Sequence, residues 1–355
     1  MGAGPGPATG AAPAPVFVLT TGRSGSTLLS RMLNEHPRLL SLSELFNRFN
    51  PEPFPGGILS GDEFASHLTR MRLFFGLICR NRLEQGGELM YPVDGGGRFD
   101  RWSVPSICMS TLPLITSDPD GLYDEVVAFA RGRPAASVAD HYSAFFNWLR
   151  HLMDRQVVVE RSGMSVMLLP QLLTAFPQAR FVHLYRDGRE CAISMSRHNG
   201  FRLLSALRSL ERASGIDLMA ADIDDLPPAP PGLPADLRDL WPDRLNAEAL
   251  GRLHVPVASC AATWSKFTLA GLRLLRRVAP DRLHTMSYED LLAEPRRTLS
   301  ALARFLRVDD NGGWLDRSAA LATDRPPRFP TLDAEEQSAV ESACRMAMKK
   351  LRQAS

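Results

Sequence analysis

The feature that most constrains this 355-residue sequence is a short strand, loop and helix unit near its start. The run Val16–Thr21 (VFVLTT) is apolar and β-branched, and Thr27–Asn34 (TLLSRMLN) has apolar residues at helical spacing. The small residues between them allow a backbone to approach an anion closely, and a helix N-terminus offers unpaired N–H groups. The loop Thr20–Leu29 (TTGRSGSTLL) therefore predicts an anion site, although a plain turn before an N-capped helix has the same local pattern.

Short apolar strands alternate with helical segments further along the chain. The strand-like runs with their following helical segments are Val157–Glu160 with 166–176, Arg180–Tyr185 with 189–197, and Leu283–Tyr288 with 295–306. Such alternation is typical of a parallel sheet that is covered on both faces. We therefore predict an α/β fold with a mostly parallel central sheet flanked by helices.

Two regions break this alternation. Residues from about 51 to 140 mix Pro, Gly and amphipathic pieces such as Glu63–Cys79, which predicts an inserted helical region. Residues from about 215 to 256 contain the Pro-rich stretch Leu226–Pro234, which predicts a loop or lid. We expect residues 1–15, a Gly/Ala/Pro tail, to be disordered, and residues 16–355 to form a single domain with these two insertions.

The sequence of the first loop argues against binding of a nucleoside triphosphate together with a metal ion. A nucleoside-triphosphatase loop reads G-x-x-x-x-G-K-[ST], with Lys on the β- and γ-phosphates and Ser or Thr on Mg²⁺. Here no Lys precedes Ser26 or Thr27, and the cation stands earlier, at Arg23. A ligand with one phosphate at this point fits better.

A second anion signal lies at the end of another predicted strand, in residues 181–199 (FVHLYRDGRECAISMSRHN). Arg186 ends the strand, Ser194 lies in the following helix, and Arg189 and Arg197 add positive charge. A structural Arg–Asp pair at a strand end gives the same pattern, so this segment alone leaves both interpretations open.

Together, in this order, the two segments resemble the sulfotransferase family that uses 3′-phosphoadenosine 5′-phosphosulfate (PAPS). TTGRSGSTLLSRMLNEHP resembles the family's 5′-phosphosulfate loop, LYRDGRECAISMS its 3′-phosphate motif, and residues 287–308 the strand and helix after the lid. The nearest branch is that of bacterial and tyrosylprotein sulfotransferases. The resemblance implies a P-loop NTPase-like three-layer sandwich and transfer of a sulfonyl group to a hydroxyl without a metal.

The resemblance also implies catalytic roles. Glu44, in SLSELF at the end of a predicted strand, occupies the place of the general base. Arg23 aligns with an arginine that contacts the sulfonyl group and the bridging oxygen. Arg161 stands where the family has Lys; it keeps the charge but cannot act as an acid, and a salt bridge to Glu160 or a neighbouring acid is an alternative role. Rival bases are His36, His183 and His198.

The predicted cofactor contacts fall into three groups. The 5′-phosphate is expected on Ser24, Gly25, Ser26 and Thr27, and the 3′-phosphate on Arg186 and Ser194. Arg325 and Arg328 stand where the family closes a C-terminal loop over the nucleotide, although an arginine in a Pro-rich loop is usually solvated.

Composition limits the partners and the compartment. A formal net charge of +2 argues against nucleic acid, and no apolar stretch is long enough to span a bilayer. Five scattered cysteines suggest neither a disulfide framework nor a zinc site, so we expect a cytoplasmic protein. The expected acceptor is a hydroxylated small molecule, sugar or lipid, and the family relatives are often homodimers.

Two other functions remain open at this point. A P-loop kinase or nucleotide hydrolase would require ATP and Mg²⁺, and the missing Gly-Lys-Ser/Thr disfavours it. A non-catalytic nucleotide-binding protein on this fold is the other alternative, because a fold does not fix a function.

Overall fold

The computed structural model describes residues 13–49, 51–226, 228–310, 312–323 and 326–354. Its centre is a five-stranded sheet in the order β2-β5-β1-β6-β7, in which all neighbouring strands are parallel. The strands are β1 (Val16–Leu19), β2 (Leu39–Ser43), β5 (Val157–Arg161), β6 (Arg180–Tyr185) and β7 (Leu283–Ser287). The predicted parallel sheet is thus confirmed, with the first strand in its middle.

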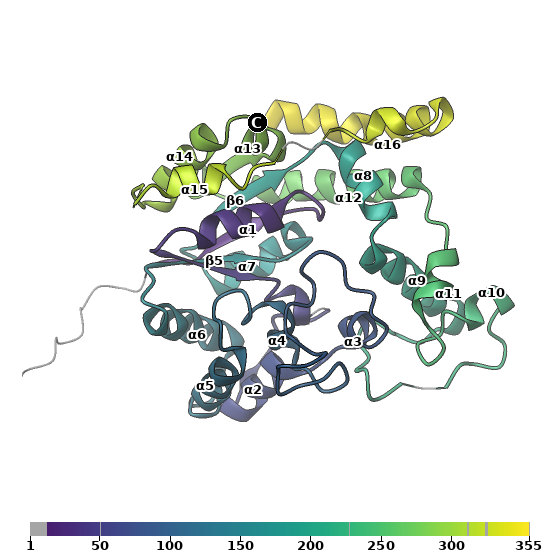
Figure 1. Cartoon of the computed structure of the whole chain (residues 1–355), viewed down its shortest axis with the longest axis horizontal. Coiled ribbons are helices and arrows are strands. Elements are labelled where there is room, and N and C mark those ends of the chain that lie inside the picture. Colours follow the sequence, from purple (N-terminus) through teal and green to yellow (C-terminus); the bar gives the residue numbers. More distant parts are fainter. Residues whose placement is uncertain (1–12, 50, 227, 311, 324–325, 355) are drawn as a thin grey trace, which may run out of the picture.

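Both faces of this sheet are buried. Alternate residues of β1 enter different apolar clusters: Phe17 and Leu19 pack on one face, and Val16 and Val18 on the other. Because side chains alternate across a strand, a run without polar residues is what a doubly covered strand requires. The predicted α/β class, with helices on both faces of the sheet, is confirmed (Figure 1).

One face is covered by helices from both ends of the chain. They are α1 (Ser26–Asn34), α13 (Tyr288–Ala293), α14 (Pro295–Leu306) and α15 (Trp314–Ala319). Trp314 is fully buried, and its indole N–H donates to the carbonyl oxygen of Met32 at 2.7 Å. This contact fastens the C-terminal part of the chain to the helix that follows the first loop.

The other face carries the helices that follow β4 and β5 together with the first insertion. These elements are β3 (Ile58–Leu59), α2 (Gly61–Thr69), α3 (Leu73–Arg80), α4 (Ser106–Ser110), α5 (Pro119–Arg131), β4 (Ala136–Ser137), α6 (Val138–Leu152) and α7 (Leu169–Ala175). The amphipathic stretch 63–79 falls in two helices, since α2 ends at Thr69 and α3 begins at Leu73. The domain boundaries themselves stay a prediction.

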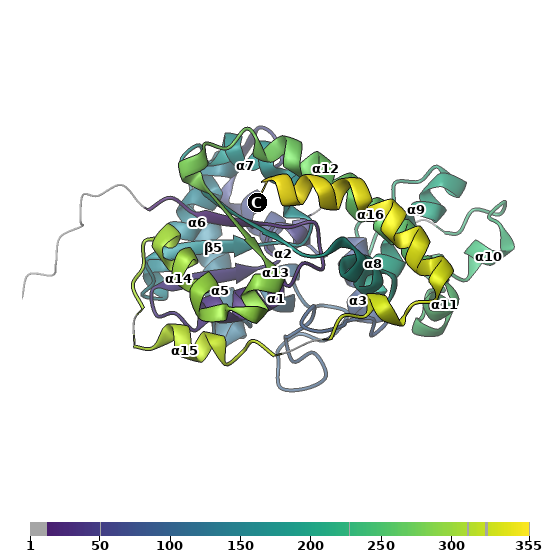
Figure 2. The same ribbon diagram turned by 90° about the horizontal axis from the view of Figure 1, so that it is seen from above.

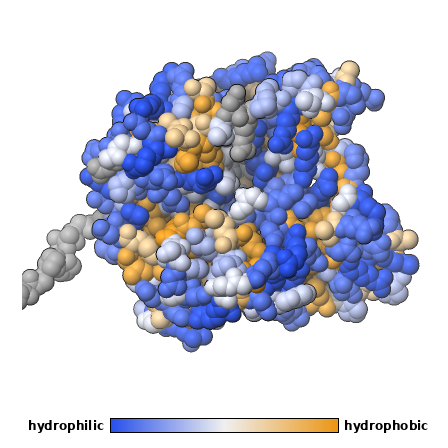
Figure 3. All heavy atoms as spheres, viewed as in Figure 1, coloured by the Kyte–Doolittle hydropathy of each residue, from blue (hydrophilic) through white to orange (hydrophobic). Residues whose placement is uncertain are grey.

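The remaining helices follow β6 in the sequence. They are α8 (Gly188–Ser196), α9 (Asn199–Ser214), α10 (Ala235–Arg238), α11 (Ala247–Arg252), α12 (Val257–Leu275) and α16 (Ala334–Ala354). Helices α12 and α16 lie side by side, with α8 against them (Figures 1 and 2). The face seen in Figure 3 mixes hydrophilic and hydrophobic side chains.

Candidate active site

The loop between β1 and α1 has an unusual backbone. Gly22 and Gly25 have φ angles of 88° and 84°, and Arg23 between them has a φ of 56°. A Cβ atom on Gly25 would lie 2.0 Å from the ring of Tyr288, so only glycine fits there. Gly25 is also the N-cap of α1 and gives it no side-chain cap, which leaves the first N–H groups of this nine-residue helix to a ligand.

The predicted hydroxyls lie around this helix start in different environments. Ser24 is buried and donates to the carbonyl oxygen of Gly22 at 3.3 Å. The side chain of Ser26 is buried, whereas Thr27 is exposed. The structure therefore places all four predicted 5′-phosphate residues, 24–27, on the last turn of the loop and the first turn of α1.

The predicted 3′-phosphate residues meet this loop from the end of β6 and from α8. The Nε atom of Arg23 donates to Oγ of Ser194 at 3.0 Å, and Nη1 of Arg186 lies 3.4 Å from the carbonyl oxygen of Arg23. The Arg186 guanidinium also packs 4.7 Å from the ring centre of Tyr288. Its Nε atom is buried and has no hydrogen-bond partner among the described residues. Two motifs that are distant in the sequence thus form one cationic site.

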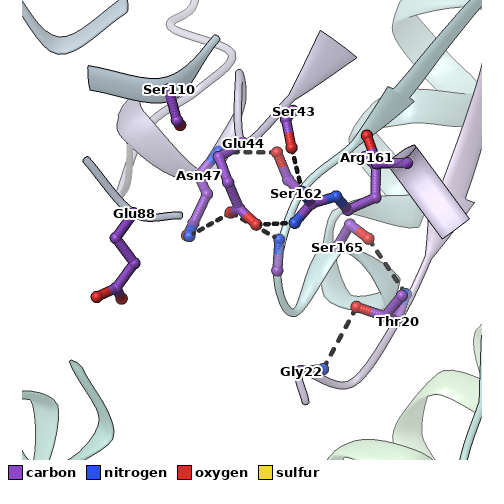
Figure 4. A network of polar contacts seen from close by, with 12 residues as sticks. Thr20, Gly22, Ser43, Glu44, Asn47, Glu88, Ser110, Arg161, Ser162 and Ser165 are labelled. Carbon is purple, nitrogen blue, oxygen red and sulfur yellow. Dashed lines mark hydrogen bonds and ion pairs between the residues drawn. The ribbon is translucent and has the colours of Figure 1, made fainter. Parts of the chain in front are cut away.

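Glu44 and Arg161 form a second cluster at the same edge of the sheet (Figure 4). Ser43 of β2 pairs in register with Arg161 of β5, so the next residue, Glu44, comes within reach of the guanidinium. Arg161 donates to Oε1 of Glu44 and to Oγ of Ser43. Oε2 of Glu44 accepts from Nδ2 of Asn47 at 2.9 Å and from the N–H of Gly163 at 3.0 Å. The acid partner of Arg161 is therefore Glu44.

These contacts decide the charge of Glu44. Burial raises the pKa of this carboxyl, but the Arg161 guanidinium and the Gly163 N–H outweigh it and hold the pKa below its ordinary value. Glu44 is therefore ionised at neutral pH. It also has a φ of 59°, and a left-handed conformation in a residue other than glycine costs on the order of 1–3 kcal/mol. Strain of this kind at both Arg23 and Glu44 is typical of functional loops.

Glu88, from the first insertion, is the main site residue that the sequence analysis missed. It lies across Asn47 from Arg161 (Figure 4), and its carboxylate stands 3.7 Å from Nε2 of His198. Burial raises the pKa of Glu88. The segment around it has no periodic pattern, so nothing in the sequence marks it.

Glu190 is a second residue that the sequence analysis missed, although it belongs to the R-D-G-R-E run. Its Oε1 accepts from the N–H groups of Arg328 and Phe329 at 2.7 and 2.8 Å, which fastens the C-terminal loop to α8. Arg328 itself is exposed, and Arg325 lies outside the described residues. Of the rival bases, His36 bonds to the backbone oxygen of Asp309 and His183 is buried within β6.

Two general features complete the description. In the described part of the chain, no cluster of three or more His, Cys, Asp or Glu side chains could hold a metal ion. No helix among the described residues is both long and apolar enough to cross a membrane. A cavity of about 250 Å³ opens between α2 and the segment after β2, where Arg48, Phe49 and His67 line part of its wall.

Three solved sulfotransferase structures match this chain over most of its length. A sulfotransferase domain from the curacin biosynthetic pathway matches with a TM-score of 0.50 and 17% identity, over 96% of this chain and 98% of that one. A sulfotransferase domain of the Synechococcus PCC 7002 olefin synthase matches with a TM-score of 0.44 and 18% identity, over 95% of this chain and 89% of that one. Sulfotransferase STF9 from Mycobacterium avium matches with a TM-score of 0.42 and 15% identity, over 94% of this chain and 76% of that one.

No curated protein sequence matches the chain significantly. The general model of the sulfotransferase domain, however, matches residues 13–323, which include the loop after β1 and the segment 181–199. The chain belongs to the sulfotransferase domain family.

Proposed function

We propose that this protein transfers a sulfonyl group from PAPS to an acceptor hydroxyl, giving adenosine 3′,5′-bisphosphate and a sulfate ester. The observation that carries the proposal is the convergence of Arg23, Arg186 and Ser194 at the open N-terminus of α1. Membership of the sulfotransferase family supports the same reaction. No step of this reaction requires a metal ion.

The two phosphate groups of the nucleotide would occupy different parts of this site. The 5′-phosphate fits the loop and the first turn of α1, where the backbone N–H groups of residues 24–27 and the hydroxyl of Thr27 are near. The 3′-phosphate fits Arg186, whose buried Nε–H has no partner among the described residues, together with the hydroxyl of Ser194. Arg186 lies 3.6 Å from Glu190, a contact that a phosphate would compete with.

The chemistry requires charge stabilisation at the leaving group. Negative charge grows on the 5′-phosphate as the sulfur–oxygen bond breaks, and Arg23 is the cation nearest to the start of α1 along the chain. Its Nε–H bond to Ser194 holds the guanidinium in place before the reaction, and preorganised charge of this kind lowers the barrier. Arg161 would act through Glu44, by fixing its charge and position.

The acceptor is proposed by class only, as a hydroxylated small molecule, sugar or lipid. Both insertions consist of irregular chain and short helices, and the first one carries Glu88 to a place beside Asn47, which supports a substrate-specific function for it. All five cysteines are buried free thiols, which supports the cytoplasm as the compartment. A homodimer remains a proposal from the resemblance alone.

Calorimetry with adenosine 3′,5′-bisphosphate in the absence of metal tests the function without knowledge of the acceptor. We expect micromolar binding that Arg186→Ala and Ser194→Ala weaken at least tenfold. Arg189→Ala is the matched control, because this arginine, near both residues, pairs with Asp187 and Glu341 instead. We expect the control to bind like the original protein.

Parallel titration with ATP and Mg²⁺ separates the alternatives. Binding of ATP with Mg²⁺ but not of the bisphosphate would replace the proposal with a kinase or nucleotide hydrolase. Binding of neither ligand would indicate a non-catalytic member of the family.

A further inference from the structure

The position of Glu88 is fixed by α9 and by the segment after β2. Its segment is fastened to the start of α9, where the backbone N–H of Asn199 donates to Oε1 of Gln85 at 2.8 Å and Nδ2 of Asn199 donates to the carbonyl oxygen of Leu83 at 3.0 Å. The carbonyl oxygen of Glu88 accepts from Nη2 of Arg48 at 2.7 Å. An insertion residue is thereby held against the site by elements on two sides.

The two oxygens of the Glu88 carboxylate differ. Oε2 accepts from the N–H of Gln85 at 2.9 Å. Oε1 faces Nε2 of His198 at 3.7 Å, which is too long for a hydrogen bond. The side chain remains 22% exposed, so a ligand can reach it.

His198 presents a hydrogen-bond donor at the same place. Its Nδ1 accepts from the N–H of Gly200 at 3.2 Å, so the proton of the neutral ring is on Nε2. Burial and the nearby Arg23 lower the pKa of His198 to about 3, which keeps the ring neutral. Its Nε2 has no hydrogen-bond partner among the described residues. Because Nε2 is buried and lies 3.7 Å from Oε1 of Glu88, the ring does not bond to that carboxylate oxygen, which remains able to accept a hydrogen bond from a ligand.

Glu44 is a weaker proton acceptor than Glu88. Both oxygens of Glu44 already accept hydrogen bonds, and its pKa is lowered. The charged and titratable groups that face Glu88 are Arg23 after β1, Glu44 after β2, Arg48 in the next turn and His198 before α9. Burial outweighs the two arginines and raises the pKa of Glu88. Two carboxyls with pKa values shifted in opposite directions are typical of divided acid–base roles.

We propose that Glu88 is the proton acceptor of the transfer. This inference rests on the proposed function. The hydroxyl oxygen forms a bond to sulfur while the bond from sulfur to the 5′-phosphate oxygen breaks. The electron pair of that bond leaves with adenosine 3′,5′-bisphosphate, and the hydroxyl proton moves to Oε1 of Glu88. Glu44 stays ionised and holds Arg161.

The test measures proton uptake when the full-length protein binds adenosine 3′,5′-bisphosphate. Calorimetry is done at about pH 6 in buffers that differ in ionisation enthalpy, because a new negative charge near Glu88 raises its pKa further and draws in a proton. We expect uptake by the original protein and its loss in Glu88→Gln, with binding at least as tight. Glu44→Gln should keep the uptake. The matched control is Glu84→Gln, in the same segment but paired with Arg101.

A second readout follows turnover. Release of the bisphosphate from PAPS is measured with a panel of alcohols and phenols, and we expect Glu88→Gln to lower kcat by roughly 10²–10⁴-fold and to remove the acidic limb of the pH profile. Bisphosphate binding by Glu88→Gln with unchanged uptake, or with unchanged turnover and pH profile, would overturn the inference and return the base to Glu44. Failure of the original protein to bind the bisphosphate would instead overturn the proposed function.

Discussion

The proposed nucleotide side and the proposed acceptor side of the site are built in different ways. On the nucleotide side, loops at the ends of β1, β6 and β7 meet, and backbone shape does most of the positioning through Gly22, Gly25 and the start of α1. On the acceptor side, side chains from an insertion reach the sheet edge, and hydrogen bonds such as that from Asn199 to Gln85 hold them.

This difference has a physical reason. A phosphate group is the same in every PAPS molecule, so a fixed backbone cradle can serve it. An acceptor varies in shape, and insertions can change without disturbing the parallel sheet. We therefore expect substitutions on the nucleotide side to affect binding of adenosine 3′,5′-bisphosphate, and substitutions on the acceptor side to affect transfer.

On the nucleotide side, the largest expected effect is that of Arg23→Ala. Loss of one preorganised contact to the leaving group costs about 2.7–4 kcal/mol, so we expect PAPS turnover to fall by roughly 10²–10³-fold while the protein stays folded. Arg31→Ala, which removes the same charge from an exposed position on α1, is the control and should turn over normally. Equal activity of the two variants would remove Arg23 from the mechanism.

Substitution of Gly25 by Ala tests the backbone cradle. The new Cβ would meet the Tyr288 ring at 2.0 Å in a residue with a φ of 84°, so we expect lower thermal stability and loss of bisphosphate binding. Gly57→Ala is a matched control, because Gly57 has a φ of 82° and its new Cβ would meet no atom within 4 Å. The control carries the backbone strain without the clash. If both variants lose the same thermal stability and both still bind the bisphosphate, close packing of Gly25 on Tyr288 is not needed for the site.

Glu160 is a fully buried carboxyl of β5, and its Oε1 accepts hydrogen bonds from the N–H of Phe46 and the hydroxyl of Ser162. Burial raises the pKa of this carboxyl from 4.5 to about 8, so the folded state holds a proton that the unfolded state releases above about pH 4.5. The stability contribution is therefore complete below that pH and is lost as the pH rises toward 8, by up to about 1.4 kcal/mol per pH unit.

The variant Glu160→Gln should abolish this dependence. Its amide oxygen can still accept from Ser162, and the side chain stays neutral at every pH. Chemical denaturation at several pH values should show the variant gaining stability relative to the original protein as the pH rises. Glu125→Gln, at an exposed position of α5, should track the original protein throughout. Parallel curves for Glu160→Gln would contradict a raised pKa.

The smallest expected effect belongs to the insertion. Ser60 and Glu63 form a capping box at the start of α2, where Oγ of Ser60 accepts from the N–H of Glu63 at 3.2 Å. Ser60→Ala should cost about 1 kcal/mol in the free energy of unfolding and leave bisphosphate binding unchanged. Ser66→Ala, at an exposed position of the same helix, is the control. A loss of bisphosphate binding in Ser60→Ala would show that the two sides are coupled.

The structure brings together the residues predicted for the nucleotide side, and their signals in the sequence are local; their roles stay a prediction. The loop 20–29 contains strand end, turn and helix start in one run, and Arg186 and Ser194 belong to one motif. The parallel sheet could also be predicted from the sequence, because strands that are buried on both faces are continuous apolar runs such as VFVL.

On the acceptor side, Glu44 and Arg161 were predicted as site residues, but their contacts and the place of Glu88 were not, because the residues involved are distant in the sequence. Arg161 meets Glu44 through the pairing of β2 with β5, a register that no local pattern encodes. Glu88 stands in an irregular segment and reaches the site only because Asn199 holds that segment against α9. No periodicity marks such a residue.

A crystal structure with adenosine 3′,5′-bisphosphate tests the central claim most directly. The account predicts the 5′-phosphate on the backbone N–H groups of residues 24–27 and the 3′-phosphate on Arg186 and Ser194, with Arg186 moved from Glu190. A nucleotide bound elsewhere, or bound here without contact to Arg186 and Ser194, would contradict it.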